Sequence, residues 1–222
     1  MVTNKRPSRE VGRPRVFTDV DVFAAVTRAI TRLGYAHLSV DAVAAEVGCT
    51  GPALIRRFGS KRGLLRAYLE QANAASIERF RWARETQGSP LAALRARFRI
   101  PTDQRPDEVA NPAGYVNLVL FHLVAWADPA LRETETQRRR LFVEEIAALL
   151  EDALDAGELV RCNPHRLSTT LLAALTGTAL QWASDPDRAI EEQLVEMIEE
   201  IVAPYRAEAG GPAGSSTKPT ST

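Results

Sequence analysis

Residues 39–65 have the sequence SVDAVAAEVGCTGPALIRRFGSKRGLL, and this stretch decides the fold. Over residues 40–47 apolar side chains recur every three or four positions, which is the spacing of a helix with one buried face. Ser39 is a favourable cap for this helix, and Gly48 ends it. After a short link, residues 51–58 show helical spacing again. Two short helices joined by a tight, glycine-containing turn are typical of a helix-turn-helix.

Further helices are expected on both sides of this motif. Thr18 and Asp21 have the spacing of a capping box at the start of one helix, and Gly34 marks its end. Ser60 caps a much longer helix that runs toward Arg84. Breaks divide the rest of the chain into about five more helices, and they lie at residues 88–90, 101–112, 128–129, 162–164 and 184–186. Because no run of alternating β-branched residues appears, the sequence predicts an all-α fold of about nine helices.

The length of the chain favours a small module joined to a larger one. Its 222 residues exceed the roughly 100 to 150 of a typical domain. We expect a flexible basic arm at residues 1–16, a helix-turn-helix domain at 17–66 and a larger helical domain at 67–208. Residues 209–222 consist mainly of Gly, Pro, Ser and Thr, which predicts a disordered tail.

The composition is that of a globular chain, with 45% hydrophobic and 25% charged residues. The N-terminus has no apolar stretch of the kind found in a signal peptide. The most apolar run, residues 115–127, is shorter than the roughly 20 residues that a membrane-spanning helix needs. Cys49 and Cys162 lack the spacing of a metal site or a disulfide framework. We therefore expect a cytoplasmic protein without membrane contact, metal or cofactor.

Charge is distributed unevenly along the chain. Residues 1–66 contain 12 Lys and Arg against 5 Asp and Glu, a net charge of +7, so residues 67–222 carry −7. A basic first third joined to an acidic remainder is typical of a polyanion-binding head on a non-binding body. A chance fluctuation is the alternative.

The outward face of the helix at 51–58 suits a DNA major groove. Leu54 and Phe58 lie on its buried side, whereas small residues at its N-terminus and arginines further along point outward. Small residues let a helix tip approach base edges, and cations meet phosphates. The alternative is that both arginines are simply solvated. The residues predicted to contact DNA are Arg13, Arg15, Ser39, Thr50, Gly51, Pro52, Ala53, Ile55, Arg56, Arg57 and Lys61.

Two of these predictions rest on separate arguments. Lys61 lies in the first turn of the long helix, where the positive end of the helix dipole disfavours a cation unless an anion docks there. A DNA phosphate would be held by the backbone amides, the dipole and Lys61 together. In the arm, residues 12–15 (GRPR) are slim and cationic, as are arms that enter a narrow minor groove. A solvated lysine and a solubilising arm are the alternatives.

The stretch at residues 39–65 resembles, position for position, the signature of the TetR family of bacterial regulators, and the resemblance covers about residues 12–66. Ile55 stands where the family usually has a tyrosine, and Arg57 where it often has a histidine. The operator sequence of relatives therefore cannot be carried over. The resemblance implies an all-helical homodimer that represses by occupying an operator, and that is released when a ligand in the C-terminal domain changes the spacing of the two heads.

The body of the chain shows no catalytic constellation, since its histidines are scattered and no nucleophile elbow or phosphate loop appears. Residues 115–126 instead predict a helix too apolar on all sides to lie on a surface. A mostly apolar cavity with one or two polar groups is the usual form of a small-molecule site. The residues expected to line it are Trp82, Phe98, Tyr115, Asn117, Leu118, Phe121, His122, Trp126 and Phe142. Ordinary core, with His122 hydrogen-bonded internally, is the alternative.

The last two helices, at about residues 164–183 and 187–205, carry apolar stripes. Two such helices from each of two subunits would form a four-helix interface about a two-fold axis. The residues expected in this interface are Leu167, Leu171, Ala174, Leu175, Thr178, Trp182, Leu194, Met197, Ile198 and Ile201. Inward packing on their own subunit is the alternative, although the resemblance favours the interface.

Several functions fit these features. The leading hypothesis is a ligand-responsive DNA-binding repressor whose partners are a palindromic double-stranded operator, a second copy of the chain and an unidentified, largely apolar small molecule. The alternative is a small-molecule carrier or metabolic enzyme that retains a helical N-terminal module. A regulator that answers to a protein partner or to its own abundance is a third option. The charge asymmetry and Lys61 favour the first hypothesis, so an enzyme is not expected.

Overall fold

The computed structural model describes residues 17–99 and 111–207, so the predicted arm at 1–16 and tail at 209–222 lie outside the described residues. Within the two ranges the chain forms nine α-helices and no strand, which confirms the predicted all-α class. The helices are α1 (Asp19–Leu33), α2 (Val40–Val47), α3 (Gly51–Phe58), α4 (Lys61–Thr86), α5 (Pro90–Phe98), α7 (Pro112–Ala127), α8 (Arg132–Asp155), α9 (Pro164–Ser184) and α10 (Ile190–Val202). Two short 3-10 helices, η1 (Tyr35–His37) and η3 (Ala203–Tyr205), follow α1 and α10.

The predicted caps start the first helices as expected. The Thr18 hydroxyl accepts a hydrogen bond from the Asp21 amide (3.2 Å), and the Asp21 carboxylate accepts one from the Thr18 amide (2.8 Å), which completes a capping box. Ser39 and Ser60 each accept a bond from the amide three residues later, at 3.1 and 3.0 Å. Because each cap satisfies amides that a helix start leaves free, the boundaries follow from local sequence.

The turn between α2 and α3 depends on two glycines. Gly48 ends α2 in the left-handed conformation, at φ +77°, which glycine adopts without strain. Gly51 is buried at the start of α3, where a Cβ atom would lie 1.9 Å from Asp41 Oδ1. The two helices therefore meet at a joint too close for a larger residue at position 51 unless Asp41 moves.

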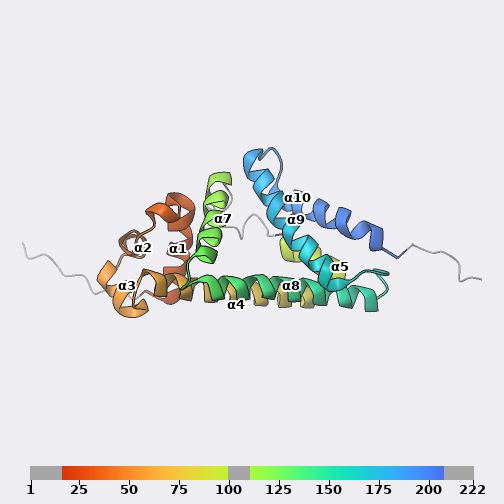
Figure 1. Cartoon of the computed structure of the whole chain (residues 1–222), viewed down its shortest axis with the longest axis horizontal. Coiled ribbons are helices and arrows are strands. Elements are labelled where there is room, and N and C mark those ends of the chain that lie inside the picture. Colours follow the sequence, from red (N-terminus) through yellow and green to blue (C-terminus); the bar gives the residue numbers. More distant parts are fainter. Residues whose placement is uncertain (1–16, 100–110, 208–222) are drawn as a thin grey trace, which may run out of the picture.

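A first hydrophobic core holds α1, α2 and α3 against the start of α4. Its buried side chains include Val22, Val26, Ile30, Val43, Leu54, Leu64 and Leu65. α7 closes this core with Phe121 and Ala125, which are fully buried in it. Figure 1 accordingly shows α7 standing beside α1. A helix of the body thus forms part of the core of the helix-turn-helix unit.

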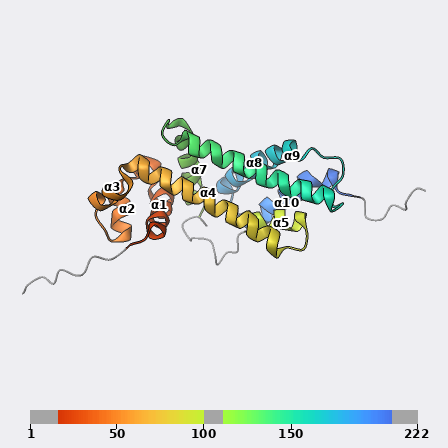
Figure 2. The ribbon, with the colours of Figure 1, turned by 90° about the horizontal axis from the view of Figure 1, so that it is seen from below.

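A second core lies further along the molecule, among the latter half of α4 and helices α5, α8, α9 and α10. Its buried side chains include Phe80, Leu94, Ile146, Leu150, Leu171 and Ile198. α4 contributes to both cores, and Figures 1 and 2 show α4 and α8 running along the length of the molecule. The 26-residue α4 therefore connects the two cores.

α7 is the most apolar of the helices and carries no Lys, Arg, Asp or Glu over its 16 residues. No single helix in the described part of the chain is both long and apolar enough to cross a membrane. Only α7 and α8 taken together reach that length and composition, and they are bent by 118° at the break between them. The described ranges also contain no group of three or more His, Cys, Asp or Glu side chains placed to hold a metal.

Candidate nucleic-acid interface and ligand cavity

α3 presents the face that its helical spacing predicts. Leu54 is 1% exposed and Phe58 packs against the first core, so both lie on the inner side. The exposed residues among those expected to meet DNA are Ser39, Thr50, Pro52, Ile55, Arg56 and Arg57. Ala53 and Lys61 are half-buried, and Gly51 is buried against Asp41. The expectation for Gly51 is corrected, because the joint with α2 covers it.

The two arginines of α3 have different surroundings. Arg57 folds back onto the start of α1, where its Nε lies 2.8 Å from Asp19 Oδ1 and its guanidinium lies 5.6 Å from the Phe17 ring centroid. Arg56 is exposed and forms no hydrogen bond or ion pair with any residue in 17–99 or 111–207. The charge of Arg56 is therefore fully available to an anionic partner, whereas Asp19 partly neutralises that of Arg57.

Lys61 has partners within the head. Its Nζ donates to the Leu38 carbonyl oxygen at 2.5 Å and lies 4.9 Å from the centroid of the Tyr35 ring. Burial lowers the pKa of Lys61. These two contacts hold the Lys61 cation at the helix start without an anion. The position of Lys61 therefore does not by itself indicate a bound phosphate. Spacing cannot reveal this contact, because Leu38 lies in the loop before α2.

An ion pair that the sequence did not predict ties the head to the body. Arg62, in the first turn of α4, places its Nε 2.9 Å from Asp128 Oδ2 in the turn between α7 and α8. The Asp128 carboxylate also accepts the Ala130 amide at 2.9 Å. The Ala130 bond first, and then the Arg62 bond, lower the pKa of Asp128.

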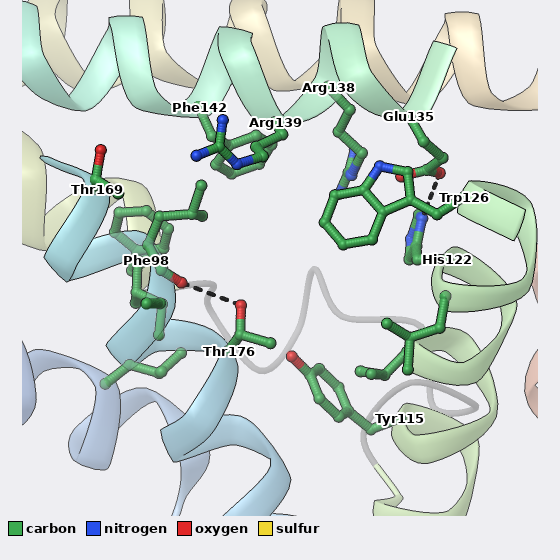
Figure 3. Close-up of a pocket in the computed structure, with 16 residues that line it drawn as sticks. Phe98, Tyr115, His122, Trp126, Glu135, Arg138, Arg139, Phe142, Thr169 and Thr176 are labelled. Carbon is green, nitrogen blue, oxygen red and sulfur yellow. Dashed lines mark hydrogen bonds and ion pairs between the residues drawn. The ribbon is translucent and has the colours of Figure 1, made fainter. Parts of the chain in front are cut away.

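A cavity of about 560 Å³ lies among α5, α7, α8, α9 and α10 (Figure 3). Five of the residues expected in such a cavity line it, namely Phe98, Tyr115, His122, Trp126 and Phe142. Its remaining lining consists of Val119, Leu123, Glu135, Arg138, Arg139, Thr169, Leu172, Ala173, Leu175, Thr176 and Leu194. The volume falls in the usual range of small-molecule sites.

Four other residues expected in the cavity do not line it, and they require a correction. Trp82 is 48% exposed on α4. The Asn117 amide donates to the Thr31 carbonyl oxygen of α1 at 2.9 Å. Leu118 and Phe121 pack into the first core. The last three lie on the side of α7 that faces the head, because a helix apolar on all sides is buried on more than one side.

His122 satisfies both interpretations that the sequence left open. Its Nδ1 lies 2.7 Å from Glu135 Oε1, and the Glu135 side chain is almost fully buried. The same imidazole lines the cavity, as Figure 3 shows. α7 therefore has one face in the head core and the opposite face on the cavity.

The apolar stripe expected at a dimer interface packs inward instead. Its bulkiest members are buried within their own subunit, none more than 7% exposed, and they are Leu167, Leu171, Leu175, Trp182 and Ile198. Leu194, Met197 and Ile201 are half-buried against the second core. Inward packing, the alternative that the stripes allowed, therefore describes these side chains. Ala174 and Thr178 are half-buried.

Two family models match the chain. The model described as "Bacterial regulatory proteins, tetR family" matches residues 23–68. The model described as "BetI-type transcriptional repressor, C-terminal" matches residues 91–205, more than half of the chain. No curated protein matches it in sequence.

Solved structures of low sequence identity share the fold. A TetR transcription regulator from Haloarcula marismortui is 18% identical, with a TM-score of 0.70 over 85% of this chain and 98% of that one. A TetR-family regulator from Streptomyces coelicolor is 20% identical, with a TM-score of 0.63 over 84% and 94%. SmeT, the repressor of the Stenotrophomonas maltophilia multidrug efflux pump SmeDEF, is 16% identical, with a TM-score of 0.60 over 92% and 98%. The helix-turn-helix, the helical body and the two family models lead to one conclusion: the chain belongs to the TetR family of transcriptional regulators.

Proposed function

We propose that this regulator is a homodimeric repressor whose two heads occupy a palindromic operator, and that a small, largely apolar molecule entering the cavity releases it. The observation that carries the proposal is the double role of α7. Phe121 and Asn117 anchor this helix in the head, while Tyr115, His122 and Trp126 on its other face line the cavity. A ligand that moves α7 must therefore move the head or disrupt the first core.

The charge and shape of the head support DNA as its partner. The net charge of +7 over residues 1–66 attracts a polyanion, and α3 offers a groove-facing surface with Arg56 unpaired among the described residues. Asp19 and Phe17 hold Arg57 in one orientation, which suits a positioning contact to phosphate. An ammonium group has three donors, so Lys61 keeps donors for a phosphate beyond the one that Leu38 occupies.

Selection of bound sequences from random duplex DNA tests this half of the proposal. A repressor of this kind enriches a palindrome, and its affinity falls as salt rises. Arg56→Gln should weaken DNA binding. It should also reduce the slope of log affinity against log salt concentration by about one unit, because one cation is removed from the interface. The matched control is Arg140→Gln, an exposed arginine of α8, which should leave both unchanged. Equal effects of the two variants, or no enriched palindrome, contradict the proposal. Ligand binding without DNA binding would instead favour the carrier.

The outer face of α9 is the surface that we propose for the dimer. Short side chains recur there at Thr170, Ala174 and Gly177, on one flank of the buried stripe. A Cβ atom at Gly177 would meet nothing within 4 Å in the single chain, so the position is open until a second copy covers it. Small residues let two helices approach closely.

The oligomeric state tests this surface. Gly177→Gln should leave the single chain folded but shift the protein toward monomer in sedimentation velocity. Ala74→Gln, at an exposed position of α4, is the control and should not change the mass. An unchanged dimer for Gly177→Gln would place the interface elsewhere.

The analogy with SmeT supports repression, since that structure is named as the repressor of an efflux pump. Release by a ligand is measured as loss of operator binding when a compound that raises the Tm of the free protein is added. Compounds that raise the Tm but never displace DNA would contradict the release step.

A further inference from the structure

The cavity has a mainly apolar lining, and its Glu and Arg residues all come from α8. Its apolar residues are Phe98, Val119, Leu123, Trp126, Phe142, Leu172, Ala173, Leu175 and Leu194. α8 brings three charged side chains to one side of the cavity, Glu135, Arg138 and Arg139, as Figure 3 shows. A ligand that fills this cavity therefore meets charged side chains at the α8 side. Elsewhere it meets a mainly apolar wall with a few neutral polar groups, from Tyr115, Thr169 and Thr176.

The charges that α8 brings to the cavity do not cancel. The carboxylate of Glu135 already has a partner, since it lies 2.7 Å from His122 Nδ1. Arg138 stacks over the Phe142 ring at 5.0 Å and forms no hydrogen bond or ion pair with any residue that the structure describes. Arg139 likewise has no such partner in the described ranges. The cavity thus has two arginines and one carboxylate, and His122 already occupies part of that carboxylate's hydrogen-bonding capacity.

A third cation lies behind two of the phenylalanine rings that line the cavity. Arg97 is 6% exposed, and its guanidinium lies 5.1 Å from the ring centroids of both Phe98 and Phe142, which line the cavity. Its Nε has no hydrogen-bond partner among the described residues. Burial, followed by repulsion from Arg79 and Arg138, lowers the pKa of Arg97 to about 9, so the group is still cationic at neutral pH. Aromatic rings contact this buried charge, and a nearby anion would further reduce the cost of burying it.

We propose that the cavity binds an organic anion, with its carboxylate or phosphate directed at Arg138 and its apolar body against the aromatic and aliphatic walls. This inference rests on the proposed ligand release and narrows the chemical class of the ligand. Arginine suits the role because its fork of donors matches a carboxylate or phosphate and stays charged. Arg139 and Arg97 add to the positive potential at the same side of the cavity.

An organic cation is the competing ligand, because aromatic side chains also bind cations. Tyr115, Trp126 and Phe98 supply three rings on the cavity wall. Glu135 is the only carboxylate in the described lining, however, and its contact with His122 already uses part of its hydrogen-bonding capacity. The balance of charge therefore favours an anion.

The test is binding of matched compounds to the purified full chain without DNA, measured by isothermal titration calorimetry. Decanoate, decyl phosphate, decanol and decyltrimethylammonium share one flexible body, and 2-naphthoate and 2-naphthol share one flat body. We expect the better of the two anion types to bind about 10-fold or more tightly than its neutral analogue, as one charged hydrogen bond implies. The carboxylate and phosphate arms tell which head group the cavity prefers.

Variants locate the effect. Arg138→Met should reduce anion affinity about 10-fold and leave decanol unchanged, whereas Arg138→Lys should retain part of the preference for anions. Arg140→Gln, an exposed position outside the cavity on the same helix, is the control and should change neither. Near-ultraviolet circular dichroism of each variant checks that its core is intact.

The outcomes separate this inference from the proposed function. Equal binding of anion and neutral analogue, stronger binding of the cation, or no binding of either anion series overturns the anion inference, whatever the DNA assays show. Anion binding that Arg138→Met weakens about 10-fold supports it, and anion binding that Arg138→Met leaves unchanged contradicts it. Anion binding without displacement of operator DNA supports the inference and contradicts release by ligand.

Discussion

Replacing Phe121 by alanine should remove much of the stability of the head. The side chain is fully buried, and its ring centroid lies 5.9 Å from those of both Tyr35 and Tyr68. Truncating a buried phenylalanine to alanine costs about 3 to 5 kcal/mol, and each aromatic pair contributes roughly 0.5 to 1.5 kcal/mol beyond its buried area. With two such pairs lost, we expect the free energy of unfolding to fall by about 4 kcal/mol or more.

Urea unfolding followed by far-ultraviolet circular dichroism measures this loss, at one fixed protein concentration because a dimer is stabilised by mass action. The matched control is Leu120→Ala, one residue earlier on α7 and 50% exposed, which should cost less than about 1 kcal/mol. If Phe121→Ala costs no more than Leu120→Ala, α7 is not anchored in the head core. The proposed path from cavity to DNA would then fail. The milder Phe121→Leu should keep the fold while weakening release of DNA by ligand.

Three further predictions concern the head and its junction. Burial raises the pKa of Glu46, but bonds from two arginines of α1 outweigh this effect and the pKa is lowered, so the stabilising pairs are lost as pH falls through that lowered value. The Tm of Glu46→Gln should therefore lie below that of the unsubstituted protein at pH 7, and the two values should converge as the pH falls below the lowered pKa. Gly63→Ala should lower the free energy of unfolding by about 1 to 3 kcal/mol, although alanine has the better helix propensity, because the new Cβ would lie 2.0 Å from the Phe58 carbonyl oxygen. Urea unfolding midpoints measure this loss, and an unchanged midpoint would refute the steric reason. Asp128→Asn breaks the charged link to the start of α4 and should speed amide hydrogen exchange there, with unchanged exchange counting against a role in the junction.

The helices of the head were predictable because their signals are local. The capping bonds of Thr18, Ser39 and Ser60 each join groups three residues apart, and Gly48 ends α2 through its own backbone preference. The periodicity of α3 likewise placed Leu54 inside and Arg56 outside. Such features need no knowledge of the rest of the chain.

The site in the body was predictable only in part. α7 is apolar on every side, so its pattern does not distinguish the cavity residue His122 from the head residue Phe121. Arg138 lies on a long, charged helix whose pattern suggests a solvated face. Only the packing of α7 and α9 around α8 turns that side chain toward a cavity, and such long-range packing leaves no periodic signal.

The anchoring of Phe17 by Arg57 has a practical consequence for handling the protein. The described structure starts at this residue beside α3 and finishes past Tyr205, at the far end of the long axis (Figure 1). An affinity tag or fluorescent fusion inserted directly before Phe17 would lie close to α3. Immobilisation for DNA titrations should therefore use the C-terminal side, which lies away from α3.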